Sequence, residues 1–266
     1  MKSDFELITK RFNEDITIYP ITDVHLGSVE HNSKEWGKFI EKIKSEPNSY
    51  VVLGGDLINN ATRSSVSNIF EELLRPREQK ELMVKYLKEI KDKILCAVSG
   101  NHERRSIKDA DDDPTYDIMC KLGLEDIYRE NIAFLRIQMG TKEDRKTSRL
   151  TTPTYVLAVT HGAGGGALTG SAVNKNERFA YTIDGLDALI VGHTHKGTVT
   201  KPSKLVIDSR NNKISFKPFT VVTSQSWLSY GGYATQKMLT PATNATADNG
   251  QKMLLKRKNK NITVIW

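Results

Sequence analysis

Short apolar runs recur along the chain and predict buried strands. Each run is of strand length, carries few charges, and most of them end in Gly, Asp, Asn or His. The runs are ITIYPI (16–21), YVVLGG (50–55), ILCAVSG (94–100), YVLAVTHG (155–162) and ALIVGH (188–193). Because apolar residues follow one another rather than alternating with polar ones, these strands are expected to be buried on both faces.

Two segments between these runs show the spacing of amphipathic helices. Residues 34–45 place Trp36, Phe39, Ile40 and Ile43 on one stripe. The segment 77–91 repeats this spacing with Leu82, Met83, Tyr86, Leu87 and Ile90. Strands that alternate with helices of this length predict an α/β domain.

The second half of the chain changes character. Looser alternation of apolar and polar residues marks IAFLRIQ (132–138), KLVIDS (204–209), KISFKPFTVV (213–222) and ITVIW (262–266). These segments predict added antiparallel strands packed on the first sheet. The stretches 140–150 and 240–251 lack apolar periodicity and are expected to be exposed loops.

Composition and length exclude several classes of protein. The chain has 266 residues, of which 38% are hydrophobic and 27% charged, which is ordinary for a globular protein and rules out collagen-like or globally disordered chains. No apolar run is long enough to span a bilayer, and the N-terminus lacks the apolar region of a secretory signal. Cys96 and Cys120 are expected to be small buried residues in a reducing compartment. We therefore expect a cytoplasmic protein with no membrane partner.

The positive charge is concentrated near the C-terminus. Residues 196–266 hold 12 Lys and Arg against Asp208 and Asp248, a balance of +10, whereas residues 1–195 have a balance of −3. One interpretation is a surface for an anionic partner such as nucleic acid, and the other is a solvated surface of strands and loops. The region also holds the aromatic residues Phe216, Phe219, Trp227, Tyr230, Tyr233 and Trp266. These aromatics either stack on bases or, since most lie in strand-like runs, pack in the core.

The histidines gather at the predicted strand ends. Five of the six follow an apolar run within one or two residues, and these are His25, His102, His161, His193 and His195. Ligands bind at the carboxyl ends of strands in open α/β sheets. The sixth, His31, lies in a polar loop and is expected to be exposed.

Carboxylate and amide side chains accompany these histidines. Asp23 precedes His25 by two residues, Asp56 follows the second apolar run, and Asn101 precedes His102. Oxygen and imidazole ligands without a thiolate suit Mn, Fe, Zn, Co or Ni rather than a closed structural zinc site. There are enough ligands for two ions, and an Asp can bridge a pair about 3.5–4 Å apart.

The ordered motifs resemble those of the calcineurin-like metallophosphoesterase superfamily. They are D-x-H (Asp23, His25), GD (Gly55, Asp56), GNHE (Gly100 to Glu103), HG (His161) and GHxH (Gly192 to His195). The resemblance covers roughly residues 16–200 and implies a four-layer α-β-β-α sandwich of two mixed sheets flanked by helices. The first motif, ITDVHLGS, also looks like that of the DNA-repair exonuclease branch, and the insert 61–80 is similar to small bacteriophage phosphoesterases.

The resemblance also implies a role for each residue. Asp23, His25, Asp56 and His195 would hold one divalent metal ion, and Asp56, Asn101, His161 and His193 the other. Manganese is favoured, with Fe, Zn, Ni, Co or Mg as alternatives. His102 would not be a ligand but would face the scissile phosphate, while a metal-bridging hydroxide attacks phosphorus in line.

The substrate is less well defined by the sequence. The stretch after Asp56 lacks the GDxxDRG arginine of protein Ser/Thr phosphatases, which disfavours a phosphoprotein substrate. Arg104 and Arg105 directly follow GNHE and are candidate phosphate contacts, or else solvated charges opposite the acidic run 109–113. That run is expected to cap a helix rather than to bind a third metal ion.

We expect a phosphodiesterase or nuclease acting on nucleic acid or nucleotides. The alternatives are a small-molecule phosphomonoesterase or nucleotide pyrophosphatase, and an inactive binding module on the same fold. Residues 1–200 would form the catalytic core, and 201–266 a basic, β-rich extension that completes the second sheet. The oligomeric state is left open.

Overall fold

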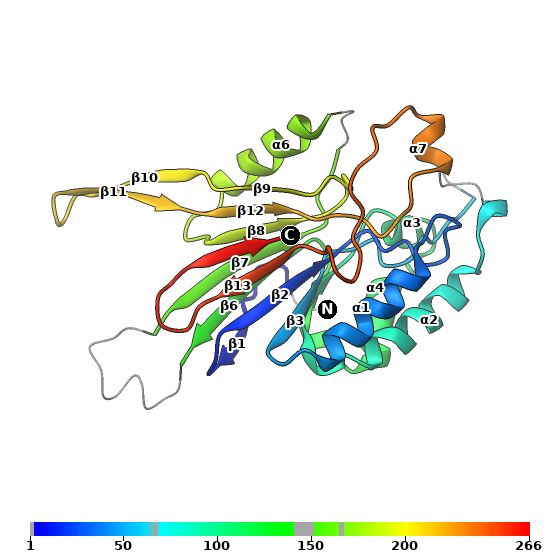
Figure 1. Ribbon diagram of the computed structural model, residues 1–266, viewed down its shortest axis with the longest axis horizontal. Coiled ribbons are helices and arrows are strands. Elements are labelled where there is room, and N and C mark those ends of the chain that lie inside the picture. The colour runs from blue at the N-terminus through cyan, green and yellow to red at the C-terminus, as the bar shows by residue number, and fades with distance from the viewer. Residues whose placement is uncertain (1–2, 64, 66–68, 141–151, 165–167) are drawn as a thin grey trace.

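Two mixed β-sheets lie face to face in the computed structural model (Figure 1), which describes residues 3–63, 65, 69–140, 152–164 and 168–266. Within these residues each large sheet has six strands. Sheet A runs in the order β1 (Ile8–Phe12), β6 (Ile132–Met139), β7 (Thr154–Thr160), β8 (Ala188–Val191), β12 (Thr220–Thr223) and β9 (Thr198–Thr200). Sheet B runs in the order β14 (Ile262–Ile265), β13 (Lys252–Leu255), β2 (Ile16–Ile21), β3 (Ser49–Leu53), β4 (Ile94–Val98) and β5 (Tyr128–Arg129).

The central strands of each sheet are parallel and the outer ones mixed. In sheet B, β2, β3, β4 and β5 are parallel, and β13 joins β2 in the antiparallel sense. In sheet A, β7, β8 and β12 are parallel, whereas β6 and β9 run against them. The carboxyl ends of the parallel strands therefore share one edge of each sheet.

Helices cover the outer faces of the sheets. α1 (Ser33–Ser45), α2 (Pro76–Lys88) and α4 (Pro114–Leu122) lie on sheet B, and α6 (Thr169–Tyr181) lies on sheet A. The remaining helices are short: α3 (Glu103–Ala110), α7 (Gly232–Gln236) and the 3-10 turns η1 (Ile69–Glu71), η2 (Lys91–Lys93) and η3 (Glu125–Ile127).

Neighbouring residues of sheet A point to opposite faces, which builds two hydrophobic layers. In β8, Ala188 and Ile190 enter the core between the sheets, while Leu189 and Val191 pack in the layer that holds Ala180 of α6. This is the period of two of an extended strand. The order helix, sheet, sheet, helix confirms the predicted four-layer sandwich.

The expected helices form where the sequence places them. Trp36, Phe39, Ile40 and Ile43 are the buried stripe of α1, whose first turn is capped by Asn32, since its side chain accepts a hydrogen bond from the Glu35 amide at 3.2 Å. The acidic run 109–113 also acts as expected. Its last residue, Asp113, caps α4 by accepting from the amides of Thr115 and Tyr116.

Two expectations about exposure are wrong. Cys96 is buried as predicted, but Cys120 lies on the exposed side of α4. His31 is not an exposed loop histidine, because its Nδ1 hydrogen-bonds the Val24 carbonyl at 2.8 Å and burial lowers its pKa.

The segment 240–251 is also more than a loop on the surface. Ala245 and Ala247 are 5% and 6% exposed and join the main core, and Lys42 donates to the Ala247 carbonyl. Isolated alanines in a polar stretch have no periodicity, and the sequence pattern therefore missed them. The other expected loop, 140–150, lies outside the described residues apart from Gly140.

The C-terminal aromatic residues divide between core and surface. Phe219 and Trp227 are buried, as the core interpretation requires, whereas Phe216 is 77% exposed, and Tyr230 and Trp266 are about half exposed. The extension from residue 201 contributes β12 to sheet A and both β13 and β14 to sheet B. A division of the chain at residue 200 stays a prediction. Among the described residues, no helix combines the length and the apolar character needed to cross a bilayer.

Candidate metal centre

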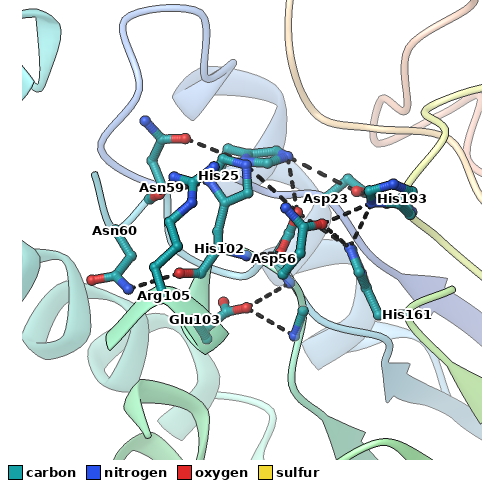
Figure 2. A network of polar contacts seen from close by, with 12 residues as sticks. Asp23, His25, Asp56, Asn59, Asn60, His102, Glu103, Arg105, His161 and His193 are labelled. Atoms are coloured by element: carbon teal, nitrogen blue, oxygen red, sulfur yellow. Dashed lines mark hydrogen bonds and ion pairs between the residues drawn. The ribbon is translucent and has the colours of Figure 1, made fainter. Parts of the chain in front are cut away.

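The predicted site residues meet at the carboxyl ends of the parallel strands. Asp23 and His25 follow β2, and Asp56 follows β3. Asn101 and His102 follow β4, while His161 follows β7, and His193 and His195 follow β8. Figure 2 shows the side chains of Asp23, His25, Asp56, His102, His161 and His193 gathered in one cluster. Because both sheets present their carboxyl ends to the same region, residues as far apart in the sequence as Asp23 and His195 come within contact distance.

The backbone of the cluster is strained. Non-glycine residues with positive φ include Asp23 at 53°, His25 at 49°, Asp56 at 50°, His193 at 70° and His195 at 58°. Residues with a Cβ rarely adopt this left-handed conformation, and each such residue costs on the order of 1–3 kcal/mol. Strain concentrated in three loops at one location indicates that the fold holds these side chains in place for function.

Two glycines let the loops after β3 and β4 touch. A Cβ on Gly55, whose φ is +88°, would lie 2.5 Å from the Gly100 amide nitrogen. A Cβ on Gly100 would lie 2.0 Å from Oδ1 of Asp56. Only glycine fits at either position, and the close contact brings Asp56 beside the Asn101–His102 turn.

One group of donor atoms surrounds the side chain of Asp23. Oδ1 of Asp23 lies 3.2 Å from Nε2 of His195 and 3.9 Å from Nε2 of His25. The Nε2 atoms of His25 and His195 are 3.2 Å apart, and Oδ2 of Asp56 is 3.8 Å from the His25 nitrogen. Asp23, His25 and His195 are one of the acidic and histidine groups close enough to hold a metal ion.

A second group of donor atoms faces the other side of Asp56. Oδ2 of Asp56 lies 3.3 Å from Nε2 of His161. Oδ1 of Asn101 is 2.8 Å from that nitrogen and 2.7 Å from Nδ1 of His193. The nitrogens of His161 and His193 are 3.3 Å apart. The same Asp56 oxygen thus borders both groups, as a bridging carboxylate requires.

Hydrogen bonds from outside the cluster orient the imidazole rings. His161 Nδ1 donates to the Gly54 carbonyl at 2.9 Å, which directs Nε2 toward Asp56 and Asn101. His25 Nδ1 contacts Oδ1 of Asn59 at 3.2 Å, and the Asn59 amide donates to Glu72. Partners of this kind fix the tautomer and direction of metal-ligating histidines.

Glu103 holds the loop that carries Asp56. Its carboxylate is fully buried and accepts from the amides of Leu57 at 2.7 Å and Ile58 at 3.2 Å. The other oxygen accepts from the amides of Asp56 and Gly100, both at 2.9 Å. Burial, followed by the charge of Asp56, raises the pKa of Glu103 to about 7. One side chain thus joins the loops after β3 and β4.

The two buried aspartates stay ionised only because positive charge lies close to them. Burial alone would raise the pKa of Asp23, but the charge and hydrogen bond of His195 outweigh burial and lower this pKa to about 2. Burial would lower the pKa of His161, but the charge and hydrogen bond of Asp56 raise it to about 9. Within the described residues, neither aspartate has a Lys or Arg ion pair, and both are at most 1% exposed.

His102 lies at the edge of the cluster. Its Nδ1 contacts the Asn59 carbonyl at 2.7 Å, which turns Nε2 toward Oδ2 of Asp56 at 3.8 Å. The backbone amide of His102 donates to Oδ1 of Asp56 at 2.8 Å. With His25 and Asp56, His102 forms a third group able to hold a metal ion by distance alone.

The two predicted arginines point in different directions. Arg105 lies beside His102, and its guanidinium donates to the same Asn59 carbonyl at 3.4 Å. Arg104 instead donates to the carbonyls of Ser99 and Glu130 at 3.3 and 3.2 Å. A cavity of about 470 Å³ is lined by residues that include Ala61, Arg63, Glu72 and Glu78, and none of the residues of the cluster lines it.

The donor set fits divalent metal ions. All donors are carboxylate or amide oxygens and imidazole nitrogens, and the atoms within each group are 2.7 to 3.9 Å apart. Ligands about 2.0–2.2 Å from a common ion would be spaced similarly, roughly 3 Å apart. Buried carboxylates that form no ion pair with Lys or Arg are found where cations bind.

A four-layer α-β-β-α sandwich with such a cluster at its strand ends is the architecture of a metal-dependent phosphoester hydrolase. Residues 16–197 match the Metallophos family, described as calcineurin-like phosphoesterase. The match spans more than half of the chain, and the chain belongs to the calcineurin-like phosphoesterase family. The predicted family resemblance and the predicted enzyme class are confirmed.

Two bacterial proteins are among the solved structures that match the chain. A metallophosphoesterase from Sphaerobacter thermophilus is 13% identical, with a TM-score of 0.39 over 94% of this chain and 87% of that one. A conserved uncharacterized protein from Streptococcus pneumoniae, titled a predicted phosphoesterase, is 11% identical, with a TM-score of 0.34 over 94% and 97% of the two chains. No curated protein matches the chain. The family assignment rests on the sequence match.

Sequence reasoning missed the supporting residues of the site. Glu103 was visible only as the last letter of GNHE, and its role depends on a contact between loops that no local pattern reveals. Asn59 follows Asp56 by three residues, which could have marked it as part of the same loop. Glu72 and Gln79, which hydrogen-bond each other beside Asn59, have no signal in the sequence.

Proposed function

We propose that this enzyme is a dinuclear metal-dependent phosphodiesterase. Asp23, His25, Asp56 and His195 hold one divalent cation, and Asp56, Asn101, His161 and His193 hold the other. The observation that carries this assignment is the position of Asp56 Oδ2, which lies 3.3 Å from His161 Nε2 and 3.8 Å from His25 Nε2. Two divalent ions, manganese being favoured, supply an acidified water and offset the negative charge of the phosphoryl oxygens.

His102 serves as the acid for the leaving group. Its Nδ1 is engaged by the Asn59 carbonyl, so that Nε2 is the atom available to the substrate. A proton delivered from Nε2 to the departing ester oxygen avoids release of an alkoxide. Glu103 and Asn59 act as positioning residues, because they fix the Asp56 loop and the His25 ring.

The surroundings of His102 favour a diester. Arg105 lies beside His102, whereas Arg104 is committed to two backbone carbonyls. A phosphodiester carries one negative charge, but a phosphomonoester carries nearly two at neutral pH and gains more from additional cations.

The positions of Lys256 and Lys260 favour a nucleotide-sized diester over a long nucleic acid. Lys256 pairs with Asp15 just before β2, and Lys260 pairs with Asp187 just before β8. Both pairs lie at the amino ends of strands whose carboxyl ends carry the cluster. A DNA or RNA strand bound in the cluster would therefore gain little from these lysines.

Hydrolysis of two chromogenic esters tests the proposal. The protein is stripped with a chelator, reloaded with Mn²⁺, and assayed with bis-p-nitrophenyl phosphate and with p-nitrophenyl phosphate. We expect a kcat/KM at least roughly tenfold higher for the diester, with loss of both activities in Asp56→Asn. Preference for the monoester would favour a small-molecule phosphomonoesterase, and no turnover with two bound ions would favour a binding module.

The adjacent arginines provide a matched pair of variants. Arg105→Met is expected to raise KM for the diester, because it removes the cation beside His102. Arg104→Met, one position away on α3, is expected to leave KM unchanged, since its side chain faces Ser99 and Glu130. Equal KM values in the two variants would remove Arg105 from the substrate site. Salt dependence of binding to single-stranded DNA separates a nuclease from a nucleotide enzyme, because backbone contacts give a steep slope.

A further inference from the structure

A two-stranded hairpin projects from the sandwich, and its base contacts the end of α6. It consists of β10 (Ser203–Asp208) and β11 (Lys213–Pro218), which pair only with each other among the described strands. In Figure 1 the hairpin extends beyond the edge of both sheets, at the left of the view. An isolated two-stranded ribbon is marginally stable in water.

One face of this hairpin is entirely apolar at its centre. The register places Leu205 opposite Phe216 and Ile207 opposite Ile214, and directly opposed residues lie on the same face. Their exposures are 67%, 77%, 74% and 67%, in that order. We call these four residues the hairpin patch.

The other face of the hairpin carries the charge. Lys204 lies opposite Lys217, and Asp208 opposite Lys213. The Lys204 ammonium donates to the carbonyls of Tyr181 and Ile183 at 3.0 and 2.8 Å, so this face turns toward the end of α6. The hairpin patch consequently points away from the body of the molecule and from the lysines.

The size of the hairpin patch requires an explanation. Four large apolar side chains, each at least two thirds exposed, present roughly 500 Å² of surface, at the upper end of the largest patches on monomeric proteins. Exposed strands with apolar side chains are also prone to uncontrolled association unless they are covered. A partner that covers the face would stabilise the ribbon as well.

We propose that the hairpin patch binds the hairpin patch of a second copy of this chain. The patch has no charge, and nucleic acid, which binds through its phosphates, would find its cations on the opposite face. Two copies related by a twofold axis would place identical apolar faces together without like-charge contact. They would bury roughly 1,000 Å², the lower limit for a specific interface, and form a small four-stranded sandwich.

The dimer leaves both metal clusters accessible. β11 leads directly into β12, which is parallel to β8, and His193 follows β8. The hairpin therefore joins the sheet at the amino end of these strands, opposite the cluster. The proposal does not depend on the proposed phosphodiesterase activity.

Sedimentation velocity over a concentration series tests the dimer. We expect the wild-type protein to approach twice its 29.9 kDa mass at about 100 µM, a concentration at which a modest interface is filled. Ile207→Lys would place a charge in the centre of the interface and is expected to yield a monomer. The matched control, Val206→Lys, changes the opposite face of the same strand and should leave the dimer intact.

Three outcomes would overturn the proposal. These are a wild-type monomer at 100 µM, a dimer that survives in Ile207→Lys, and equal dissociation by both variants. Far-UV circular dichroism and bound metal content verify that the variants are folded, since the hairpin lies far from the cluster. A monomer that floats with phosphatidylcholine–phosphatidylglycerol vesicles through the same patch would identify a lipid surface as the occupant instead.

Discussion

The two ends of the sandwich treat charge in opposite ways. At the carboxyl ends of the strands, Asp23 and Asp56 are buried and surrounded by imidazoles on left-handed backbone. At the amino ends, charges such as Lys256 and Asp15 are about half exposed and meet in simple pairs. In the first arrangement, desolvation of the charges and backbone strain lower the free energy of unfolding. The exposed ion pairs of the second arrangement change it little in either direction.

The comparison shows that the amount of charge in a region does not decide whether that charge has a function. The balance of +10 in residues 196–266 is the larger feature of the sequence, yet most of it is spread over surface strands and turns. The cluster has only two carboxylates, but both are buried, and each therefore needs a bound cation to offset its charge. We therefore expect catalysis at the carboxyl ends of the strands, where burial of charge costs the most free energy.

The largest expected effect comes from Asp56→Asn. The amide cannot bridge two cations as a carboxylate does, and we expect both metal equivalents to be lost together and activity to fall by at least roughly 1,000-fold. Metal content by mass spectrometry, measured beside turnover, checks this. Retention of two full equivalents would reject the bridging role and weaken the contrast between the two ends.

The next largest effect is expected for His102→Ala. Removal of the acid should lower kcat by roughly 100- to 10,000-fold while both metal ions remain bound. The control is the metal content of the same variant, because His102 lies close enough to Asp56 to be a ligand. Loss of one equivalent would reassign His102 as a ligand.

Glu103→Ala examines how far the carboxyl end depends on its supporting residues. Four backbone amides would lose their acceptor, and we expect a decrease of about 3–5 kcal/mol in the free energy of unfolding. Urea unfolding measures the change. Glu103→Gln retains one carbonyl oxygen, and its stability should lie between those of the wild type and Glu103→Ala. An unchanged stability of Glu103→Ala would show that the loops after β3 and β4 stay together without this carboxylate.

The smallest effect is expected at the amino end. Lys256→Met removes the partner of Asp15, and we expect a change below about 1 kcal/mol in stability, with no change in diester hydrolysis. Thermal unfolding and the chromogenic assay suffice as measurements. A marked loss of activity would mean that the amino end of the strands takes part in catalysis.

Local patterns in the sequence predicted the strands, the helices and the polar residues at the strand ends, and the family resemblance predicted the four layers. The stripe of Trp36 and Phe39 and the apolar runs are repeated local signals, and the carboxyl ends of parallel strands lie together in any such sheet. The contact of Gly55 with Gly100 and the four hydrogen bonds of Glu103 could not be predicted in this way. They depend on the distance between loops far apart in the sequence.

Exposure was predicted less well than position along the chain. Cys120 was expected to be buried but lies on the outer side of α4, and Phe216, for which packing in the core was one of two interpretations, is exposed on the projecting hairpin. A strand pattern indicates which residues share a face and does not indicate whether another layer covers that face. The register of the hairpin was needed to reveal its unpaired apolar side.

The carboxylate of Glu103 also bears on the order of events in folding. Its four donors belong to residues 56–58 and to Gly100, on either side of the β3–β4 pairing. The loops are separated by more than 40 residues, and closing such a separation is a slow, non-local step. The carboxylate is satisfied only after β3 and β4 have paired. The catalytic loops are therefore expected to become ordered together with the central sheet, late in folding, and not as a local element that forms early.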